Sequence, residues 1–376
     1  MANLNQEVLL GMDVFLPSTA EQTRIVEKLE ELLSDLDAGV AELKAAQKKL
    51  TQYRQSLLKA AVEGALTAEW RRHNRPAETG AQLLERILRE RRARWEAKQL
   101  AKFKEQGKTP PKGWQDKYPE PARPDTSGLP ELPEGWVWGS VDCLLAEIET
   151  GKSFKCDERT PGRNEVGVAK VSAVSWGEYN ELESKTCTDP ARMNDALYIR
   201  KGDFLFSRAN TIELVGACVI AGAVNLRVML SDKILRFEFA NGALKEWLLH
   251  FLRAEAGRAQ IESLATGNQD SMRNIGQERI RQISVPIPPE LEITEIQKTL
   301  AQQMEARDGQ SVAISIALKQ SAAQRKNILK AAFSGQLVPQ DPNDEPASVL
   351  LERIRAERAA RAAVKEPRRR KVKESA

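Results

Sequence analysis

Three short polar segments hold the side chains of this sequence that could do chemistry. One is Ser207–Thr211, the second runs from Asn268 to Asn274, and the third is Gly151–Lys155. Arginine, asparagine and glutamine heads form paired hydrogen bonds with guanine and adenine edges, whereas lysines and hydroxyls suit phosphate oxygens. The chemistry indicated is recognition of nucleic acid, with a structural turn or helix cap as the alternative for each segment. The candidate contact residues are Lys152, Ser153, Lys155, Arg208, Asn210, Thr211, Asn268, Gln269, Ser271 and Arg273.

The types and spacing of the residues give little support for catalysis or metal binding. The two histidines, His73 and His250, stand in no metal-ligand spacing, and the four cysteines are dispersed with no CxxC pair. TGKSF at 150–154 lacks the GxxxxGK spacing of a phosphate-binding loop, and no NPPF- or DPPY-like methylation motif or glycine-rich cofactor loop occurs. We therefore expect no catalytic residues, no metal and no cofactor in this chain. The cysteines should be reduced thiols, and His250 should pack in an apolar helix.

Charge is distributed unevenly along the 376 residues. Residues 70–125 contain 15 Lys and Arg against 8 Asp and Glu, and residues 353–376 contain 10 against 3. The stretch 129–284 between them is mildly acidic, with 19 basic and 22 acidic residues. The basic segments either face nucleic acid or form solvated helix faces and a disordered tail. No apolar run approaches the ~20 residues of a membrane span, and the start lacks a secretory signal, which predicts a cytoplasmic protein.

The elements that must position these side chains are indicated by an internal repeat. Residues 14–67 match residues 285–338 at a constant shift of 271 without a gap, so that Glu21 corresponds to Glu292 and Gly64 to Gly335. LLERI at 83–87 recurs at 350–354 after a slip of four residues. The same shift relates Asn3, Gln6 and Glu7 to Asn274, Gln277 and Glu278. We therefore interpret residues 1–13 as the remnant of the end of a missing domain.

Each repeat copy predicts one long helix, from about Ala20 to Glu63 in the first. Ser18 or Thr19 is a candidate N-cap, and glycine follows each helix where a C-terminus favours it. Leucine recurs every seventh residue in the first copy, whereas Arg307 and Ser321 interrupt the corresponding seam in the second. Such a helix would be about 65 Å long, about two turns of B-DNA. The predicted pairing residues are Leu29, Leu36, Leu43, Leu50, Leu57, Ile314 and Ile328.

The predicted fold class is α+β: one mixed α/β target-recognition domain flanked by two long helices that form an antiparallel coiled-coil pair. Within the domain we expect a strand near 132–141, a helical turn at 143–149, four further strands, a helix at 244–265 and a polar loop at 265–274. The predicted strands are 166–174, 203–206, 215–221 and 233–239. The predicted segments are 1–13 (remnant), 14–68 (first long helix), 69–128 (basic helical segment and Pro/Gly linker), 129–284 (recognition domain), 285–338 (second long helix) and 339–376 (helix and disordered basic tail).

In this order and spacing the motifs resemble those of type I restriction–modification specificity subunits. The resemblance rests on LPEGWVW at 132–138, GDFLFSRAN at 202–210, ELVGACVI at 213–220 and SDKILRF at 231–237. ATGNQDSMRNI at 265–275 and the VPIPP-to-helix junction at 285–289 complete the pattern over essentially the whole chain. Members of this family carry two recognition domains, so the chain resembles a half-length form with one.

The resemblance implies a non-catalytic subunit that reads double-stranded DNA from the major groove. Two modification subunits would clasp the helices and supply S-adenosylmethionine and adenine-N6 methylation, and a restriction subunit can join them. A chain with one recognition domain is expected to pair with a second copy or with a separately encoded half. The alternative is a coiled-coil adaptor or decoy that binds methyltransferase subunits without specifying DNA. The residues leave the DNA target and the choice between base and phosphate contacts open.

Overall fold

The computed structural model describes residues 10–269 and 271–364. The chain divides into two compact units, one formed by Met1–Leu50 with Arg307–Ala376 and the other by Thr51–Ala306. Most of the predicted remnant at 1–13 and the basic tail after residue 364 lie outside the described residues. In the described chain, no helix is both long and apolar enough to cross a membrane.

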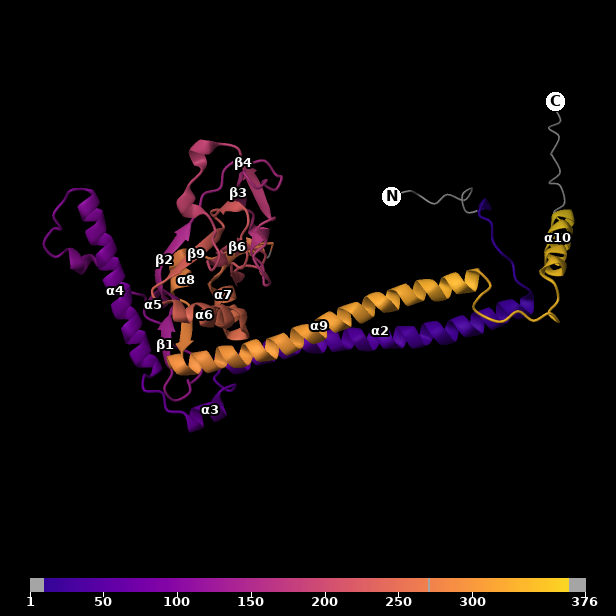
Figure 1. The fold of residues 1–376 in the computed structure, drawn as a ribbon, viewed down its shortest axis with the longest axis horizontal. Coiled ribbons are helices and arrows are strands. Elements are labelled where there is room, and N and C mark those ends of the chain that lie inside the picture. Colours follow the sequence, from indigo (N-terminus) through magenta and orange to yellow (C-terminus); the bar gives the residue numbers. More distant parts are fainter. Residues whose placement is uncertain (1–9, 270, 365–376) are drawn as a thin grey trace, which may run out of the picture. The chain divides into compact units, whose positions relative to one another are not determined.

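In the part of the chain that the structure describes, the longest elements are two helices of 44 residues each, α2 (Thr19–Val62) and α9 (Glu290–Phe333). The Ser18 hydroxyl accepts a hydrogen bond from the Glu21 amide at 3.1 Å and caps α2, as predicted. The helices run antiparallel and side by side (Figure 1), which confirms the predicted pair. In the unit Thr51–Ala306 the Tyr53 hydroxyl donates to Gln303 at 2.9 Å, and in the other unit Arg325 pairs with Asp37 at 2.5 Å.

The heptad residues of the two long helices are buried to different degrees. Leu29, Leu36, Leu43 and Leu50 are half-buried, and Leu57 is buried. On α9 the positions 307, 314, 321 and 328 are also half-buried at the same seven-residue spacing. Arg307 and Ser321 therefore lie on the same stripe of α9 as the two isoleucines.

Both long helices end at a glycine in the left-handed region. Gly64 has φ 72° and Gly335 has φ 68°, conformations that L side chains rarely adopt. The Leu66 amide donates to the Ala60 carbonyl, and the Gln336 amide donates to the Ala331 carbonyl, both at 2.9 Å. These bonds satisfy carbonyls that the last helical turn leaves without partners, so the two copies of the repeat end alike.

The remaining helices are short apart from the basic helix that follows the first repeat copy and the one that ends the described chain. A capping box of Thr79 and Gln82 begins that basic helix, α4. The helices are α3 (Ala68–His73), α4 (Gly80–Glu105), α5 (Val141–Leu144), α6 (Lys245–Arg253), α7 (Glu255–Leu264), α8 (Gln277–Arg281) and α10 (Ala347–Val364).

Among the described residues, the strands of the recognition domain form four small sheets. The largest is antiparallel in the order β2-β9-β5-β7, and a second one, β4-β3-β8, contains the parallel pair β3 and β8. The third is β10-β11-β6, and the fourth joins β1 to β12. The strands are β1 (Val137–Ser140), β2 (Leu145–Thr150), β3 (Val166–Ala169), β4 (Ser184–Cys187), β5 (Phe204–Ser207), β6 (Ala209–Asn210), β7 (Cys218–Ile220), β8 (Arg227–Met229), β9 (Ile234–Phe239), β10 (Thr266–Gln269), β11 (Met272–Asn274) and β12 (Ser284–Ile287).

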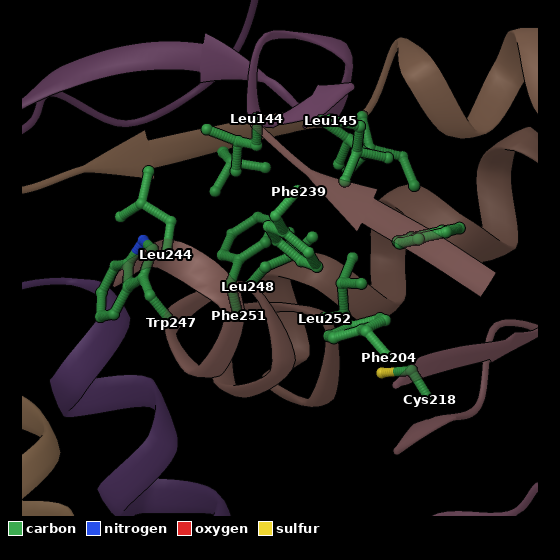
Figure 2. Packing of buried hydrophobic residues seen from close by; sticks show 14 of the residues in the cluster. Leu144, Leu145, Phe204, Cys218, Phe239, Leu244, Trp247, Leu248, Phe251 and Leu252 are labelled. Atoms are coloured by element: carbon green, nitrogen blue, oxygen red, sulfur yellow. The ribbon is translucent and has the colours of Figure 1, made fainter. Parts of the chain in front are cut away.

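The main core lies between α6 and the four-stranded sheet, where leucine and aromatic side chains interdigitate (Figure 2). Phe204 on β5 stacks on Phe237 of β9 with ring centroids 5.2 Å apart. Trp247 is fully buried, and its indole N–H donates to the Pro286 carbonyl of β12 at 2.7 Å. The core therefore fixes the recognition domain to the strand that leads into α9.

Four predicted elements differ from those found, and one of them is the polar loop at 265–274, which forms β10 and β11. Residues 143–149 were predicted as a helical turn, but only Val141–Leu144 is helical and β2 follows at once. The predicted strand 166–174 ends at Ala169 and continues as a 3-10 turn. The predicted helix 244–265 is broken at Ala254, whose ψ of 159° is extended, because α6 and α7 turn there to cover different parts of the core.

His250 on α6 gives the fold a measurable pH dependence. Burial, followed by the positive charges of Arg253 and Arg54, lowers the pKa of the imidazole from 6.5 to about 4. The unfolded chain therefore takes up this proton first, and stability falls as pH decreases from 6.5 towards 4. We expect His250→Gln to flatten the plot of unfolding free energy against pH in that window, measured by denaturant titration. An unchanged slope would show that His250 titrates normally.

Candidate nucleic-acid interface

The structure brings all three polar segments to one region of the recognition domain. The turn Ser231–Lys233, which precedes β9, connects them through backbone hydrogen bonds. The Gly151 amide donates to the Ser231 carbonyl at 3.2 Å, and the Arg208 amide donates to the Lys233 carbonyl at 2.9 Å. On the other side of Arg208, β6 pairs with β11 of the 266–274 segment. Segments that begin at residues 151, 207 and 268 therefore meet around one turn.

The segment 265–274, predicted as a polar loop, is a β-hairpin. Strands β10 and β11 pair from Thr266 opposite Asn274 to Gln269 opposite Met272, and β11 then pairs with β6. The sequence shows no apolar alternation here because the hairpin projects from the core and all four residues of β10 are exposed. Main-chain bonds to β6 hold its base. The hairpin therefore presents Asn268, Gln269 and Ser271 to solvent.

Two of the three candidate residues in the segment 207–211 are held in a turn by hydrogen bonds within the protein. The Asn210 carboxamide oxygen accepts from the Thr211 amide at 2.9 Å, and the Thr211 carbonyl accepts from the Val215 amide at 2.8 Å. These contacts give Asn210 and Thr211 a turn-forming role. Arg208 donates from Nε to the Asn274 side chain at 3.3 Å. Within the described residues its two terminal nitrogens have no protein acceptor, so they can reach a DNA acceptor.

In the segment 151–155, Lys152 and Ser153 lie near the Ser231–Lys233 turn, whereas Lys155 does not contact it. Gly151 passes the Leu230 carbonyl so closely that an added Cβ would lie 1.8 Å from that oxygen, so only glycine fits. Lys152 is exposed, and the Ser153 hydroxyl donates to Asp232 in the connecting turn. Lys155 lies beyond Phe154, over which the Arg192 guanidinium stacks at 5.1 Å, and no described contact joins Lys155 to the turn.

Sequence reasoning missed two residues of the same region. Lys233 is exposed in the connecting turn, and Met272 is 66% exposed on the hairpin. Lys233 belongs to the SDK triplet directly before an apolar strand, and polar residues at that position commonly form a turn. That triplet was the available signal for Lys233, whereas nothing in the sequence marks Met272 as solvent-facing.

The described residues contain no cluster of three or more His, Cys, Asp or Glu side chains that could hold a metal ion. Burial raises the pKa of the Cys218 thiol to about 12, although the neighbouring Arg253 opposes the shift. Burial and the nearby Cys187 also raise the pKa of Cys156. Both thiols therefore stay protonated at neutral pH, which disfavours metal binding and nucleophilic chemistry at these two residues.

A buried polar cluster attaches the recognition domain to the long helices inside the unit Thr51–Ala306. The fully buried Glu292 carboxylate accepts from the Trp136 indole at 2.9 Å, the Thr67 hydroxyl at 2.7 Å and the Arg71 guanidinium at 2.6 Å. Arg71 also donates to the Gly64 carbonyl at 2.7 Å. We call these residues the Glu292 cluster. It fixes the orientation of the domain that carries the polar segments.

These features define a class of protein in which a mixed α/β domain with an exposed polar region is held by a pair of long antiparallel helices. No family model matches the chain. The EcoEI specificity subunit of type I restriction enzymes from Escherichia coli is 26% identical over 294 residues, covering 76% of this chain and 46% of that relative. The EcoKI specificity subunit from Escherichia coli strain K12 is 25% identical over 375 residues, covering 96% of this chain and 67% of the relative.

All of these relatives are specificity subunits of type I restriction enzymes, and their similarity to the chain covers between 76% and 96% of its length. The chain spans about half the length of the first of these relatives and two thirds of the second. A chain in a solved structure of a type I restriction–modification system superposes with a TM-score of 0.52 at 18% identity, covering 85% of this chain and 61% of that chain. That superposition shows a shared fold.

Proposed function

We propose that this chain is the sequence-specific DNA-recognition subunit of a type I restriction–modification complex. The observation that carries the proposal is the meeting of the three polar segments at the Ser231–Lys233 turn, on a domain attached to the helices by the Glu292 cluster. Rigid attachment matters because recognition of a split target needs a fixed distance between its two halves. The similarity to specificity subunits of type I restriction enzymes supports the same conclusion.

In this proposal the chain directs chemistry that its partners perform. Two modification subunits would clasp the helix pair, bind S-adenosylmethionine and methylate adenine N6, and a restriction subunit can join the complex. This chain would supply no catalytic group, cofactor or metal. Because its substrate would be the bacterial chromosome, we place the complex in the cytoplasm.

Comparison of methylomes with and without the gene tests the proposal. Cells that express the chain with its modification subunits should carry N6-methyladenine at a defined sequence, and deletion of the gene should abolish methylation at that sequence. An adaptor or decoy would instead leave the target unspecified or lower methylation directed by another specificity subunit. Unchanged methylation after deletion would contradict the proposed function.

The acidic balance of residues 129–284 leads to an expectation about binding. Phosphate attraction supplies much of the affinity for DNA, so the isolated chain should bind DNA weakly and the complex tightly. Nanomolar sequence-specific binding by the chain alone at physiological salt would contradict this. A second recognition domain, from another copy or from a separately encoded half, would complete the target. The mass of the assembled complex gives the number of specificity chains for each pair of modification subunits.

A further inference from the structure

The end of α4 and the segment that follows it carry a concentrated positive charge. Residues 102–117, which we call the basic arm, contain five lysines against one glutamate and one aspartate. All five lysines are exposed, and within residues 10–269 and 271–364 none of their ammonium groups forms a hydrogen bond or an ion pair. Their charge is therefore available to a partner. The five are Lys102, Lys104, Lys108, Lys112 and Lys117.

Aromatic packing gives the basic arm a fixed shape. Trp114 of the returning segment stacks on Trp95 of α4 with ring centroids 5.8 Å apart, and Phe103 meets Trp114 edge-on at 6.1 Å. Tyr118, directly after the arm, meets Trp95 edge-on at 5.5 Å. The segment after α4 therefore packs back on the helix. Because the backbone of the arm is ordered before a partner binds, binding costs little conformational entropy.

A buried arginine joins the basic arm to the recognition domain. Arg91 of α4 is 5% exposed. It donates from Nε to the carbonyl of Leu145, the first residue of β2, at 2.9 Å, and from Nη1 to the Tyr118 hydroxyl at 2.5 Å. It also pairs with Asp142 at 3.4 Å. One side chain therefore holds α4, the end of the returning segment and β2 together, all within the unit Thr51–Ala306.

The contacts between α4 and β2 show in which direction the basic arm extends. Further along both elements from the buried arginine, Lys98 pairs with Glu147, and Lys102 and Glu149 line one groove. Helix α4 therefore lies beside the recognition domain and runs in the same direction as β2 (Figure 1). Strand β2 leads directly to Gly151, where the first polar segment begins. The arm and the polar segments consequently lie towards the same end of the four-stranded sheet.

The residue types of the basic arm favour nucleic acid as its partner. A lysine ammonium group suits phosphate oxygens, whereas protein interfaces are depleted in lysine and have cores rich in aromatic side chains. The aromatic rings near the arm pack on one another and on α4 instead of forming an exposed apolar patch. Residues 129–284 contain 19 basic and 22 acidic residues and so supply no net attraction for phosphates.

We propose that the basic arm binds the phosphate backbone of DNA next to the polar segments, independently of base sequence. The inference rests on the proposed function and adds to it a second DNA contact, outside the recognition domain. Phosphate contacts fix the register of a protein on the duplex, whereas contacts to base edges read the sequence. The arm therefore raises the affinity for every DNA and leaves the choice of target to the recognition domain.

Replacement of all five lysines by alanine tests the arm in the complex with the modification subunits. The complex is titrated with a target duplex taken from the methylome and with an unrelated duplex, at several salt concentrations. We expect both slopes of log K against log salt to fall by about 4, because each lost phosphate contact removes about 0.9. The ratio of the two affinities should stay unchanged. The matched control replaces the same five lysines by arginine, which keeps the charge and should preserve affinity and slope.

A fall of less than about 2 in either slope would overturn the proposal, because it would leave at most two phosphate contacts to the arm. Equal losses in the alanine and arginine variants would also overturn it, since charge would then not be the cause. A third contrary result is loss of modification subunits from the alanine variant, measured as the mass of the complex without DNA. The arm would then bind an acidic protein surface.

The unrelated duplex separates this proposal from the proposed function. A lower slope on that duplex in a system without a methylation target would support the arm and contradict sequence-specific recognition. A defined methylation target together with unchanged slopes would reject the arm and retain the recognition function.

Discussion

Glu292→Ala is expected to destabilise the unit Thr51–Ala306 by about 3 kcal/mol, the low end of what removal of one partner from a buried ion pair costs. The substitution leaves the Trp136 indole and the Thr67 hydroxyl without their acceptor and leaves the Arg71 charge without its counter-ion. Arg71 retains some access to water and its bond to the Gly64 carbonyl, which keeps the loss from being larger. Denaturant titration of the chain and its variant measures the difference in unfolding free energy.

The repeat supplies the matched control for this prediction. Glu21→Ala removes the same side chain at the equivalent helix position but breaks no described hydrogen bond or ion pair, so it should change the unfolding free energy by less than about 1 kcal/mol. The difference between the two variants isolates what the recognition domain contributes to the Glu292 cluster. Equal losses at both positions would show that the carboxylates act on their own helices. The docking of the domain would then need another explanation.

The long helices could be predicted because their determinants are local. The heptad spacing, the Ser18 cap and the glycines after each helix act within a few residues, and each of them is where the sequence places it. The antiparallel arrangement also followed from the sequence, since two copies of a helix with a weak core of its own pair most simply in that way.

The interior of the recognition domain was less predictable because it depends on distant partners. Arg236 sits in the alternating strand sequence KILRFEF, where a charged residue would be expected to face solvent, but its side chain is buried. It forms ion pairs with Glu149 on β2 and Asp203 before β5, which are 87 and 33 residues away. The residues around Arg236 in the sequence do not indicate that these two carboxylates pair with it. The buried charge is tolerated because the fold supplies them.

The candidate interface shows the same division between local and distant determinants. Residue type identified three polar segments whose side chains lie mostly outside the core, since hydrogen-bonding heads outside apolar runs are rarely buried, although Ser207 is buried at the end of β5. Their meeting depends on the Gly151 and Arg208 bonds to the Ser231–Lys233 turn and on the pairing of β6 with β11. These are main-chain contacts that carry no side-chain signature. Sequence therefore supplied the candidate residues, and the structure supplied their common location.

Lys152→Ala and Gln269→Ala should separate phosphate contact from base contact at this interface. A glutamine that pairs with adenine adds about 1–3 kcal/mol of discrimination, so Gln269→Ala should weaken binding to the target about 5- to 150-fold and leave non-specific binding unchanged. Lys152→Ala should weaken target and non-specific DNA alike and lower the slope of log K against log salt by about 1. The assembled complex with its modification subunits is titrated with both DNAs at several salt concentrations.

Lys201→Ala is the control for both variants because Lys201 is exposed on the same domain at the opposite end of β5 from Arg208. It should leave target affinity and the salt slope unchanged. If Lys152→Ala and Gln269→Ala both behave like Lys201→Ala, the polar region around the Ser231–Lys233 turn does not touch DNA. If Gln269→Ala lowers the salt slope instead of specificity, the hairpin lies on the phosphate backbone, and base recognition must come from Arg208 or from residues outside the three segments.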